Sequence, residues 1–348
     1  MLRKFPLLLE EGQSRRGGLR IPACFLFLRR TLILAGLSAL AATSASIAAE
    51  PAYPTRAVRL IVPFAPGGSD IIARMLAPRL SEKLGQSFVV ENRAGAASVL
   101  GTDMVAKAPP DGYTVLFCTA SHAATAVFLK KLPYDPVRDF ESVASVGAVP
   151  FVLVTHPALP VKSVKEFITF ARSRPGQLFY SSAGTGGIGH LANELFAKET
   201  GIKVTHVPYK GTGPMLTALL VGEVQFSMPQ VSGALAIIQA GKARTLGVAA
   251  AQRMPMAPEI PTLREAGVDH VSGTWYGVLA PRGAPRQAID VLNREINTQL
   301  KDTAFREQLT ARGLVLDIMA PQEFAAFVKN EIDKWRGVMR AAGIKQEE

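Results

Sequence analysis

The chain has 348 residues, which suits about two domains of ordinary size, and 48% of them are apolar while 19% are charged. This composition excludes a disordered or collagen-like chain, and two cysteines exclude a disulfide scaffold. The net charge is +11, but seven basic and two acidic residues fall within residues 1–48. The rest of the chain therefore carries only a mild and scattered excess of basic residues. This distribution differs from the dense basic stripe of a nucleic-acid-binding protein.

The N-terminal segment predicts export to the periplasm. The pair Arg29-Arg30 precedes an apolar run at 31–42, and small residues follow up to Ala48 or Ala49, where we expect cleavage. The run is shorter than the roughly 20 residues that span a bilayer, so a cleaved signal over residues 1–48 is favoured over an anchor. The segment before the pair is long for a positive flank, and the pair also resembles a twin-arginine signal, so the true start codon and the export route stay open.

Short apolar strands alternate with helices along the rest of the chain. In chain order, we expect strand 58–64, helix 70–84, strand 88–91, helix 99–108, strand 113–118, helix 163–173, strand 178–181, helix 189–200, strand 204–208, helix 213–221, strand 224–228, strand 244–250, helix 285–300, helix 303–311, strand 315–318 and helix 321–342. Because short buried strands separated by helices are typical of parallel sheets, the pattern predicts an α/β fold.

Two apolar stretches, 143–155 and 271–280, are too long and too apolar to be linkers, and they separate similar α/β blocks. Two such crossings predict one lobe from both chain ends, residues 49–148 with 278–348, and a second lobe from residues 149–277. A two-lobed protein with crossing hinge strands leaves an interlobe cleft, which is a common place for a small ligand.

The first glycine-rich loop, residues 63–70 (PFAPGGSD), leads from an expected strand into an expected helix. Gly67 and Gly68 allow the backbone to approach a ligand closely, and Ser69 or Asp70 can cap the helix. A helix N-terminus offers free N–H groups and the positive end of a dipole, so it binds anions without a lysine. The alternative is a loop that only turns the chain and caps the helix.

The second glycine-rich loop, residues 180–190 (YSSAGTGGIGH), also leads from strand to helix. Its glycines at 184, 186 and 189 match G-x-G-x-x-G, but the dinucleotide fingerprint needs an acidic residue about 20 positions further on, and residues 204–211 contain none. A dinucleotide-using oxidoreductase is therefore only the alternative, and the loop predicts a second anion-binding helix start.

Motifs for catalysis or metal binding are absent from the sequence: it has no Walker lysine, H-E-x-x-H, G-x-S-x-G or C-x-x-C. We therefore expect no catalytic residue, no cofactor, no metal and no enzyme activity. Cys118 is interpreted as a buried apolar side chain and His190 as a packing or loop-bracing residue. Trp275 and Tyr209 are interpreted either as packing or loop residues or as pocket lining.

A series of short motifs runs through nearly the whole mature chain: Y-P-x-R at 53–56, the loop at 63–70, V-E-N-R-A-G at 90–95, P-D-G-Y at 110–113, S-A-G at 182–184, H-L at 190–191, V-P-Y-K-G at 207–211, A-G-K at 240–242 and P-T at 261–262. Together they resemble the Bug family, the extracytoplasmic solute-binding proteins of tripartite tricarboxylate transporters. The resemblance implies a two-lobed periplasmic binding protein, type II-like, that closes on a small carboxylate and delivers it to the membrane subunits of a transporter. The carboxylate would be a di- or tricarboxylate, an acidic amino acid or an aromatic acid, and we expect the protein to be a monomer.

The same resemblance implies the ligand contacts, which would be backbone amides, hydroxyls and water rather than a salt bridge. Together with the two aromatic candidates above, the expected ligand-binding residues are Phe64, Gly67, Gly68, Ser69, Asp70, Thr119, Ser121, Ser182, Ala183, Gly184, Thr185, Tyr209 and Trp275. Ser69 would donate to one carboxylate and Thr185 to the other, and Phe64 would pack on the carbon skeleton.

One position departs from the family pattern. Relatives often carry an aspartate where this chain has Pro229, which favours a ligand without an amino group. An enzyme on the same scaffold, or a sensor that reports to a receptor, are the alternatives to a transport protein.

Overall fold

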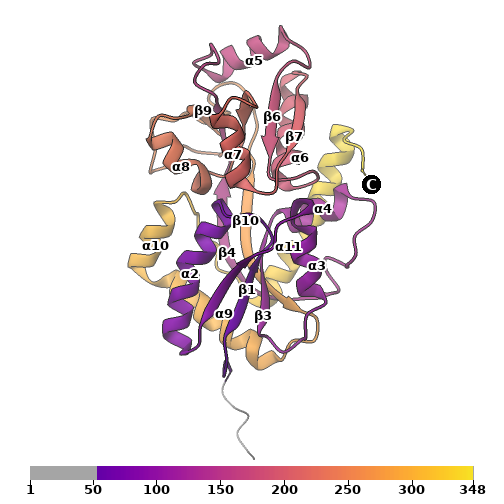
Figure 1. Ribbon diagram of the computed structural model, residues 1–348, viewed down its shortest axis with the longest axis vertical. Coiled ribbons are helices and arrows are strands. Elements are labelled where there is room, and N and C mark those ends of the chain that lie inside the picture. The colour runs from indigo at the N-terminus through magenta and orange to yellow at the C-terminus, as the bar shows by residue number, and fades with distance from the viewer. Residues whose placement is uncertain (1–52, 348) are drawn as a thin grey trace, which may run out of the picture. The chain divides into compact units, whose positions relative to one another are not determined.

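The computed structural model of the protein describes residues 53–347 (Figure 1). The predicted export signal and its cleavage site lie outside the described residues. Among the described helices, none combines the length and the apolar character needed to span a membrane.

Two five-stranded sheets organise the described chain. The first has the order β2-β1-β3-β10-β4, made by β1 (Val58–Val62), β2 (Phe88–Asn92), β3 (Thr114–Thr119), β4 (Phe140–Pro150) and β10 (Gly273–Pro281). The second has the order β7-β6-β8-β5-β9, made by β5 (Val152–Thr155), β6 (Phe179–Ser182), β7 (Thr205–Pro208), β8 (Phe226–Ser227) and β9 (Arg244–Val248). Strands β1, β2 and β3 run parallel, as do β6, β7 and β8, while β10 and β5 pair antiparallel with their neighbours.

Helices cover both sheets, and each sheet with its helices is called a lobe here. Lobe 1 carries α2 (Gly68–Leu84), the short 3₁₀ turn η1 (Ala96–Ser98), α3 (Val99–Ala106), α4 (Ser121–Phe128), α9 (Arg286–Lys301), α10 (Thr303–Thr310) and α11 (Pro321–Ala342). Lobe 2 carries α5 (Val164–Arg172), α6 (Ile188–Thr200), α7 (Thr212–Leu220) and α8 (Val231–Gln239). All six residues of β3 are buried, as expected for a strand covered on both faces. The predicted α/β architecture with two lobes is confirmed.

The two predicted crossings meet at one point between the lobes. Strand β4 of the first sheet and β5 of the second are separated by the single buried residue Phe151. The Phe151 N–H donates to the Ser272 carbonyl (3.1 Å), and the Ala249 N–H donates to the Phe151 carbonyl (2.8 Å). Three segments of the chain, around residues 151, 249 and 272, are thus hydrogen-bonded at one place between the sheets. Such a crossing can serve as a hinge. The predicted lobe ranges, with boundaries at 148 and 277, stay a prediction.

Three details differ from the sequence expectations. Helices α4 and α8 were not expected: α4 is buried along nearly its whole length, so it shows no amphipathic period, and α8 contains Gly233 and few charged residues. The strand expected at 315–318 is wrong beyond its first residue, because only Val315 makes a bridge, to Ala148.

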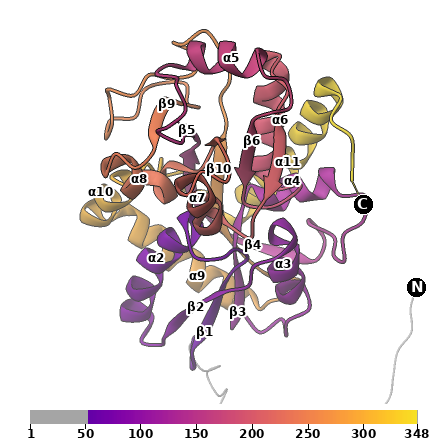
Figure 2. The ribbon, with the colours of Figure 1, turned by 45° about the horizontal axis from the view of Figure 1, so that its top comes forward.

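The helices of the two lobes face each other across the hinge. Helix α2 of lobe 1 contacts α8 of lobe 2, and α4 contacts α6 (Figure 2). The N-terminal ends of these helices surround the site described next.

Candidate functional site

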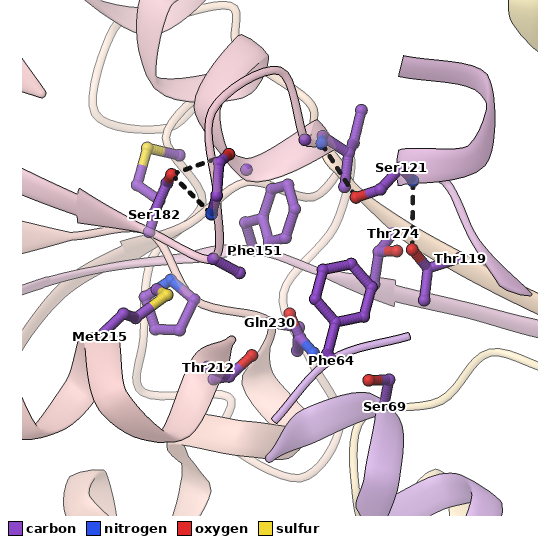
Figure 3. Close-up of a pocket in the computed structure, with 17 residues that line it drawn as sticks. Phe64, Ser69, Thr119, Ser121, Phe151, Ser182, Thr212, Met215, Gln230 and Thr274 are labelled. Carbon is purple, nitrogen blue, oxygen red and sulfur yellow. Dashed lines mark hydrogen bonds between the residues drawn. The ribbon is translucent and has the colours of Figure 1, made fainter. Parts of the chain in front are cut away.

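A pocket lies between the lobes, close to the hinge (Figure 3). Its lining residues are Phe64, Ser69, Thr119, Ser121, Phe151, Ser182, Ala183, Gly184, Gly187, Ile188, Gly189, Thr212, Met215, Met228, Pro229, Gln230 and Thr274. The cavity volume is about 30 Å³, and one water needs roughly 10–15 Å³ of such volume, so the lobes are nearly closed on it. None of these lining residues has an ionisable side chain.

Five helices of the described chain begin at this pocket. Ser69 lies in the first turn of α2, Ser121 begins α4, Ile188 begins α6, Thr212 begins α7, and Gln230 precedes α8. In none of the five does the side chain of the N-cap residue accept an N–H of its own helix, although neighbouring hydroxyls accept the first N–H of α4 and of α6. The first N–H groups of a helix lack partners within the helix, and the helix dipole makes this end positive. The pocket is therefore suited to an anion although it has no lysine or arginine.

Hydroxyl groups of lobe 1 form a short chain that reaches lobe 2. The Ser121 N–H donates to Thr119 Oγ1 (3.1 Å), and the Ile188 N–H of lobe 2 donates to Ser121 Oγ (3.2 Å) (Figure 3). Each of these two hydroxyls accepts a backbone hydrogen and donates to no described group. Their own hydrogens are therefore available to a ligand.

Two further hydroxyls line the pocket without any hydrogen-bond partner among the described residues. Ser69 of α2 and Thr212 of α7 are 3% and 5% exposed, and they lie on the two lobes. Neither hydroxyl oxygen is itself fully buried, so both are open to the cavity and can donate to a ligand there.

The second glycine-rich loop is held in place by side chains behind it. The Gly184 N–H donates to Ser182 Oγ (3.2 Å), and the Gly186 N–H donates to His190 Nδ1 (3.1 Å), which confirms the bracing role predicted for His190. Gly184 has φ 143°, a conformation that favours glycine. Thr185, the neighbour expected to touch the ligand, does not line the pocket.

The first glycine-rich loop contributes less to the pocket than expected. Phe64 and Ser69 line it, whereas Gly67, Gly68 and Asp70 do not. A Cβ at Gly67 would lie 2.9 Å from Thr212 Cβ of lobe 2. The Asp70 carboxylate, instead of facing a ligand, accepts from Arg74 Nε (3.0 Å) in the next turn of the helix.

Three other sequence-predicted residues lie outside the pocket lining. The Trp275 indole donates to Glu331 (3.1 Å) and packs edge-on against Phe324 of α11, so its role is packing between β10 and that helix. Tyr209 follows β7 and donates its N–H to the Ser182 carbonyl (2.9 Å). Cys118 is buried as predicted, and burial raises the pKa of its thiol.

Sequence reasoning missed the helix starts of α7 and α8. Thr212, Met215, Pro229 and Gln230 come from these two helices and the strand before α8. Gly211, with φ 146°, precedes α7 in the same strand–glycine–helix order as the two loops that were found, and this was the available signal.

The charged groups around the pocket leave its interior neutral. Burial lowers the pKa of His190 to about 4 and of His206, behind Ser182, to about 3, so both rings are uncharged at pH 7. Among the described residues, no three histidine, cysteine or carboxylate side chains gather as a metal site would require.

Comparison with known proteins agrees with this geometry. Residues 72–344 match the family described as "Tripartite tricarboxylate transporter family receptor". The chain belongs to this receptor family. BugT of Bordetella pertussis is 39% identical over 321 residues, which cover 91% of this chain and 98% of BugT.

Solved structures of family-like binding proteins superpose closely on this receptor. A Rhodopseudomonas palustris protein solved with adipate is 38% identical, with a TM-score of 0.83 over 85% of this chain and 100% of that one. MatC from Rhodopseudomonas palustris, solved with bound malate, is 35% identical, with a TM-score of 0.78 over 82% of this chain and 99% of that one. The chain is a periplasmic solute-binding receptor of the Bug type.

Proposed function

We propose that this receptor captures a small dicarboxylate between its lobes in the periplasm and delivers it, as a monomer, to the membrane subunits of a tripartite tricarboxylate transporter. The observation that carries the proposal is the convergence of five helix N-termini, none capped by its own N-cap side chain, on one pocket that has no ionisable lining side chain. Such a site stabilises negative charge with fixed dipoles and backbone N–H groups.

The pocket also favours a ligand with an apolar middle and no amino group. Its apolar lining residues include Phe64, Phe151, Met215, Met228 and Pro229. No carboxylate side chain lines the pocket to pair with an ammonium group, and burying such a charge without a partner is costly. The adipate and malate found in the two solved relatives are dicarboxylates without an amino group.

Individual residues take complementary roles in this proposal. Ser69 and Thr212, whose hydroxyls have no other described partner, donate to the two carboxylates from opposite lobes. Thr119 and Ser121 add hydroxyl donors, and the backbone from Ser182 to Gly184 adds polar groups from lobe 2. Hydrogen bonds to an ionised group are worth about 1.5–3 kcal/mol each, so a few of them account for micromolar binding.

Direct hydrogen bonds between the lobes support closure around the ligand in this proposal. The Ala65 N–H donates to the Lys210 carbonyl (3.0 Å), and the Ile188 N–H donates to Ser121, so both pairs join the lobes directly. An anion between the helix ends adds attraction in the closed form only, and it therefore shifts the population toward closure. Phe151 and Ser272, bonded at the crossing, provide the hinge.

A binding screen tests the proposal. Adipate, succinate, malate, aspartate, benzoate and NAD⁺ are tested by thermal shift and then by calorimetry. We expect the unsubstituted dicarboxylates to raise Tm, since ligand at 100 times its Kd adds about 2.7 kcal/mol of stability, and we expect aspartate and NAD⁺ to have little effect. A shift with NAD⁺ and none with any acid would favour the oxidoreductase alternative.

A matched pair of variants ties the binding to the pocket. Thr212→Val should weaken the dicarboxylate about tenfold through loss of one hydroxyl donor, whereas Thr217→Val, on the exposed side of the same helix, should leave the affinity unchanged. Equal affinities for the two variants would place the ligand elsewhere.

Delivery is tested in cells. Uptake of the labelled acid should fail when the gene for this chain is deleted and return when it is restored. Normal uptake in the deletion strain would instead support the sensor alternative.

A further inference from the structure

A histidine behind the pocket wall contacts one of the hydroxyls that face the ligand. Ser182 ends β6 and is 1% exposed, and its Oγ lies 2.7 Å from Nε2 of His206 on the adjacent strand β7. The same Oγ accepts the Gly184 N–H and is within donating distance of the Gly184 carbonyl, both at 3.2 Å. His206 itself does not line the pocket, and its ring faces a separate crevice with His190 and Glu194.

The position of one hydrogen on His206 decides what Ser182 offers to a ligand. A serine hydroxyl has a single hydrogen, and a neutral imidazole donates from one nitrogen while accepting at the other. If Nε2 is a bare lone pair, Ser182 gives its hydrogen to His206 and presents only lone pairs to the pocket, which repel a carboxylate. If Nε2 carries the hydrogen, His206 donates to Ser182, and the serine hydrogen is left to the Gly184 carbonyl at 3.2 Å or to a ligand carboxylate, which is the stronger acceptor.

The neighbouring ring, His190, has a hydrogen bond that fixes its own tautomer. His190 stacks on His206 with ring centroids 3.9 Å apart and planes within 13°. Its Nδ1 accepts the Gly186 N–H, so in the neutral ring its hydrogen is on Nε2. The Tyr180 ring of β6 also stacks on His206, with ring centroids 5.0 Å apart. The orientation of His206 is therefore set by packing, and its tautomer is the remaining variable.

We propose that His206 is a positioning residue for anion capture: its Nε2–H donates to Ser182 Oγ, so that the Ser182 hydrogen is not taken by the imidazole and can pass from the Gly184 carbonyl to the ligand carboxylate. This inference rests on the proposed function. It adds a residue that acts on the ligand only through Ser182.

The tautomer is tested by ¹⁵N NMR of histidine-labelled protein, with and without saturating adipate. Two-bond ¹H–¹⁵N correlations distinguish the two neutral tautomers. We expect the Nε2–H form of His206 in the adipate complex. The Nδ1–H form in that complex would overturn the inference.

A double-mutant cycle tests the route through Ser182. His206→Phe keeps the aromatic stack but removes the donor, and Ser182→Ala removes the hydroxyl. We expect each variant to weaken adipate about tenfold and the double variant to be no weaker than Ser182→Ala alone. His206→Gln, which retains an N–H donor, should recover most of the affinity.

The outcomes separate the two proposals. An equal loss from His206→Phe in the wild-type and Ser182→Ala backgrounds would show that His206 does not act through Ser182, while the proposed function would stand. If the wild-type chain bound no carboxylate at all, both the proposed function and this inference would be overturned. Unchanged Tm values of the unliganded variants show that a weaker affinity is not a folding defect.

Discussion

The loops 63–70 and 180–190 both lead from a strand into a helix through glycines, yet they meet the pocket in different ways. Loop 180–190 lines it with Ser182, Ala183 and Gly184 and then with the first residues of α6. Loop 63–70 lines it only with Phe64 and Ser69. Its two glycines instead lie against the starts of α7 and α8, where a Cβ at Gly68 would lie 2.2 Å from Gln230 Nε2.

The same glycine-rich sequence pattern therefore has different structural roles in the two loops. In loop 180–190, Gly184 and Gly186 have positive φ values that favour glycine, and an added Cβ at either would also lie less than 3 Å from an atom of lobe 1. In loop 63–70, the glycines allow helices of the opposite lobe to approach closely, so they serve closure. The distinction predicts different responses to acid, to added side-chain volume and to loss of distant packing.

Acid should affect loop 180–190 most strongly, because it is backed by buried histidines. Burial lowers the pKa values of His190 and His206 from the ordinary 6.5 to about 4 and about 3. The folded protein therefore has its full stability above pH 6.5, and the free energy of unfolding decreases as the pH falls from 6.5 toward these values. Each histidine should lower the free energy of unfolding by up to about 1.4 kcal/mol per pH unit there. Urea midpoints at pH 7, 6 and 5 measure this slope. His206→Phe should reduce it, and an unchanged slope would show that His206 is not the titrating group.

A methyl group at Gly184 should cause the larger of the two glycine effects. Its φ of 143° disfavours a side chain, and a Cβ would lie 2.8 Å from Ala97 Cα in lobe 1. We expect Gly184→Ala to weaken dicarboxylate binding about 10- to 100-fold in calorimetry. Gly337→Ala in α11, where a Cβ meets nothing within 4 Å, is the control and should bind normally. Wild-type affinity in Gly184→Ala would rule out a tight contact at this loop.

A methyl group at Gly67 should act on closure rather than on the ligand contacts. The added Cβ would meet Thr212 Cβ at 2.9 Å and Gly213 N at 3.0 Å across the lobes. We expect about a tenfold loss of affinity and a small-angle scattering profile that stays expanded in saturating adipate, whereas the wild-type profile compacts. Wild-type compaction in this variant would mean that loop 63–70 only turns the chain.

Trp275 provides the smallest expected effect. Since its indole contacts Glu331 and Phe324 rather than the pocket, Trp275→Phe should change the dicarboxylate Kd less than about twofold, while loss of its hydrogen bond lowers stability by about 1 kcal/mol. Calorimetry and urea unfolding measure the two quantities. A clear loss of affinity would instead indicate that Trp275 contacts the ligand.

The sequence was sufficient for the fold because the alternation of buried strands and amphipathic helices is local. Helices α9 and α11 and strands β1 and β3 follow directly from their apolar spacing. Helix α4 was not predicted, because burial on nearly all sides removes the alternation of apolar and polar residues that marks a surface helix.

About half of the pocket was predictable for a related reason. Phe64, Ser69, Ser121 and Ser182 lie at strand ends where glycines or small residues mark a strand-to-helix turn. Thr212 had one local signal, Gly211 between a strand and a helix, whereas no local pattern marked Gln230. Asp70 was expected at the ligand, but a basic residue one turn along the helix pairs with it instead.

A crystal structure of the complex with adipate tests the central claim most directly. The account predicts one carboxylate near the Ser69 hydroxyl and the start of α2, the other near Thr212 and the start of α7, and the methylene chain against Phe64. A carboxylate held by a lysine or arginine side chain, or adipate bound outside the space between the lobes, would contradict it.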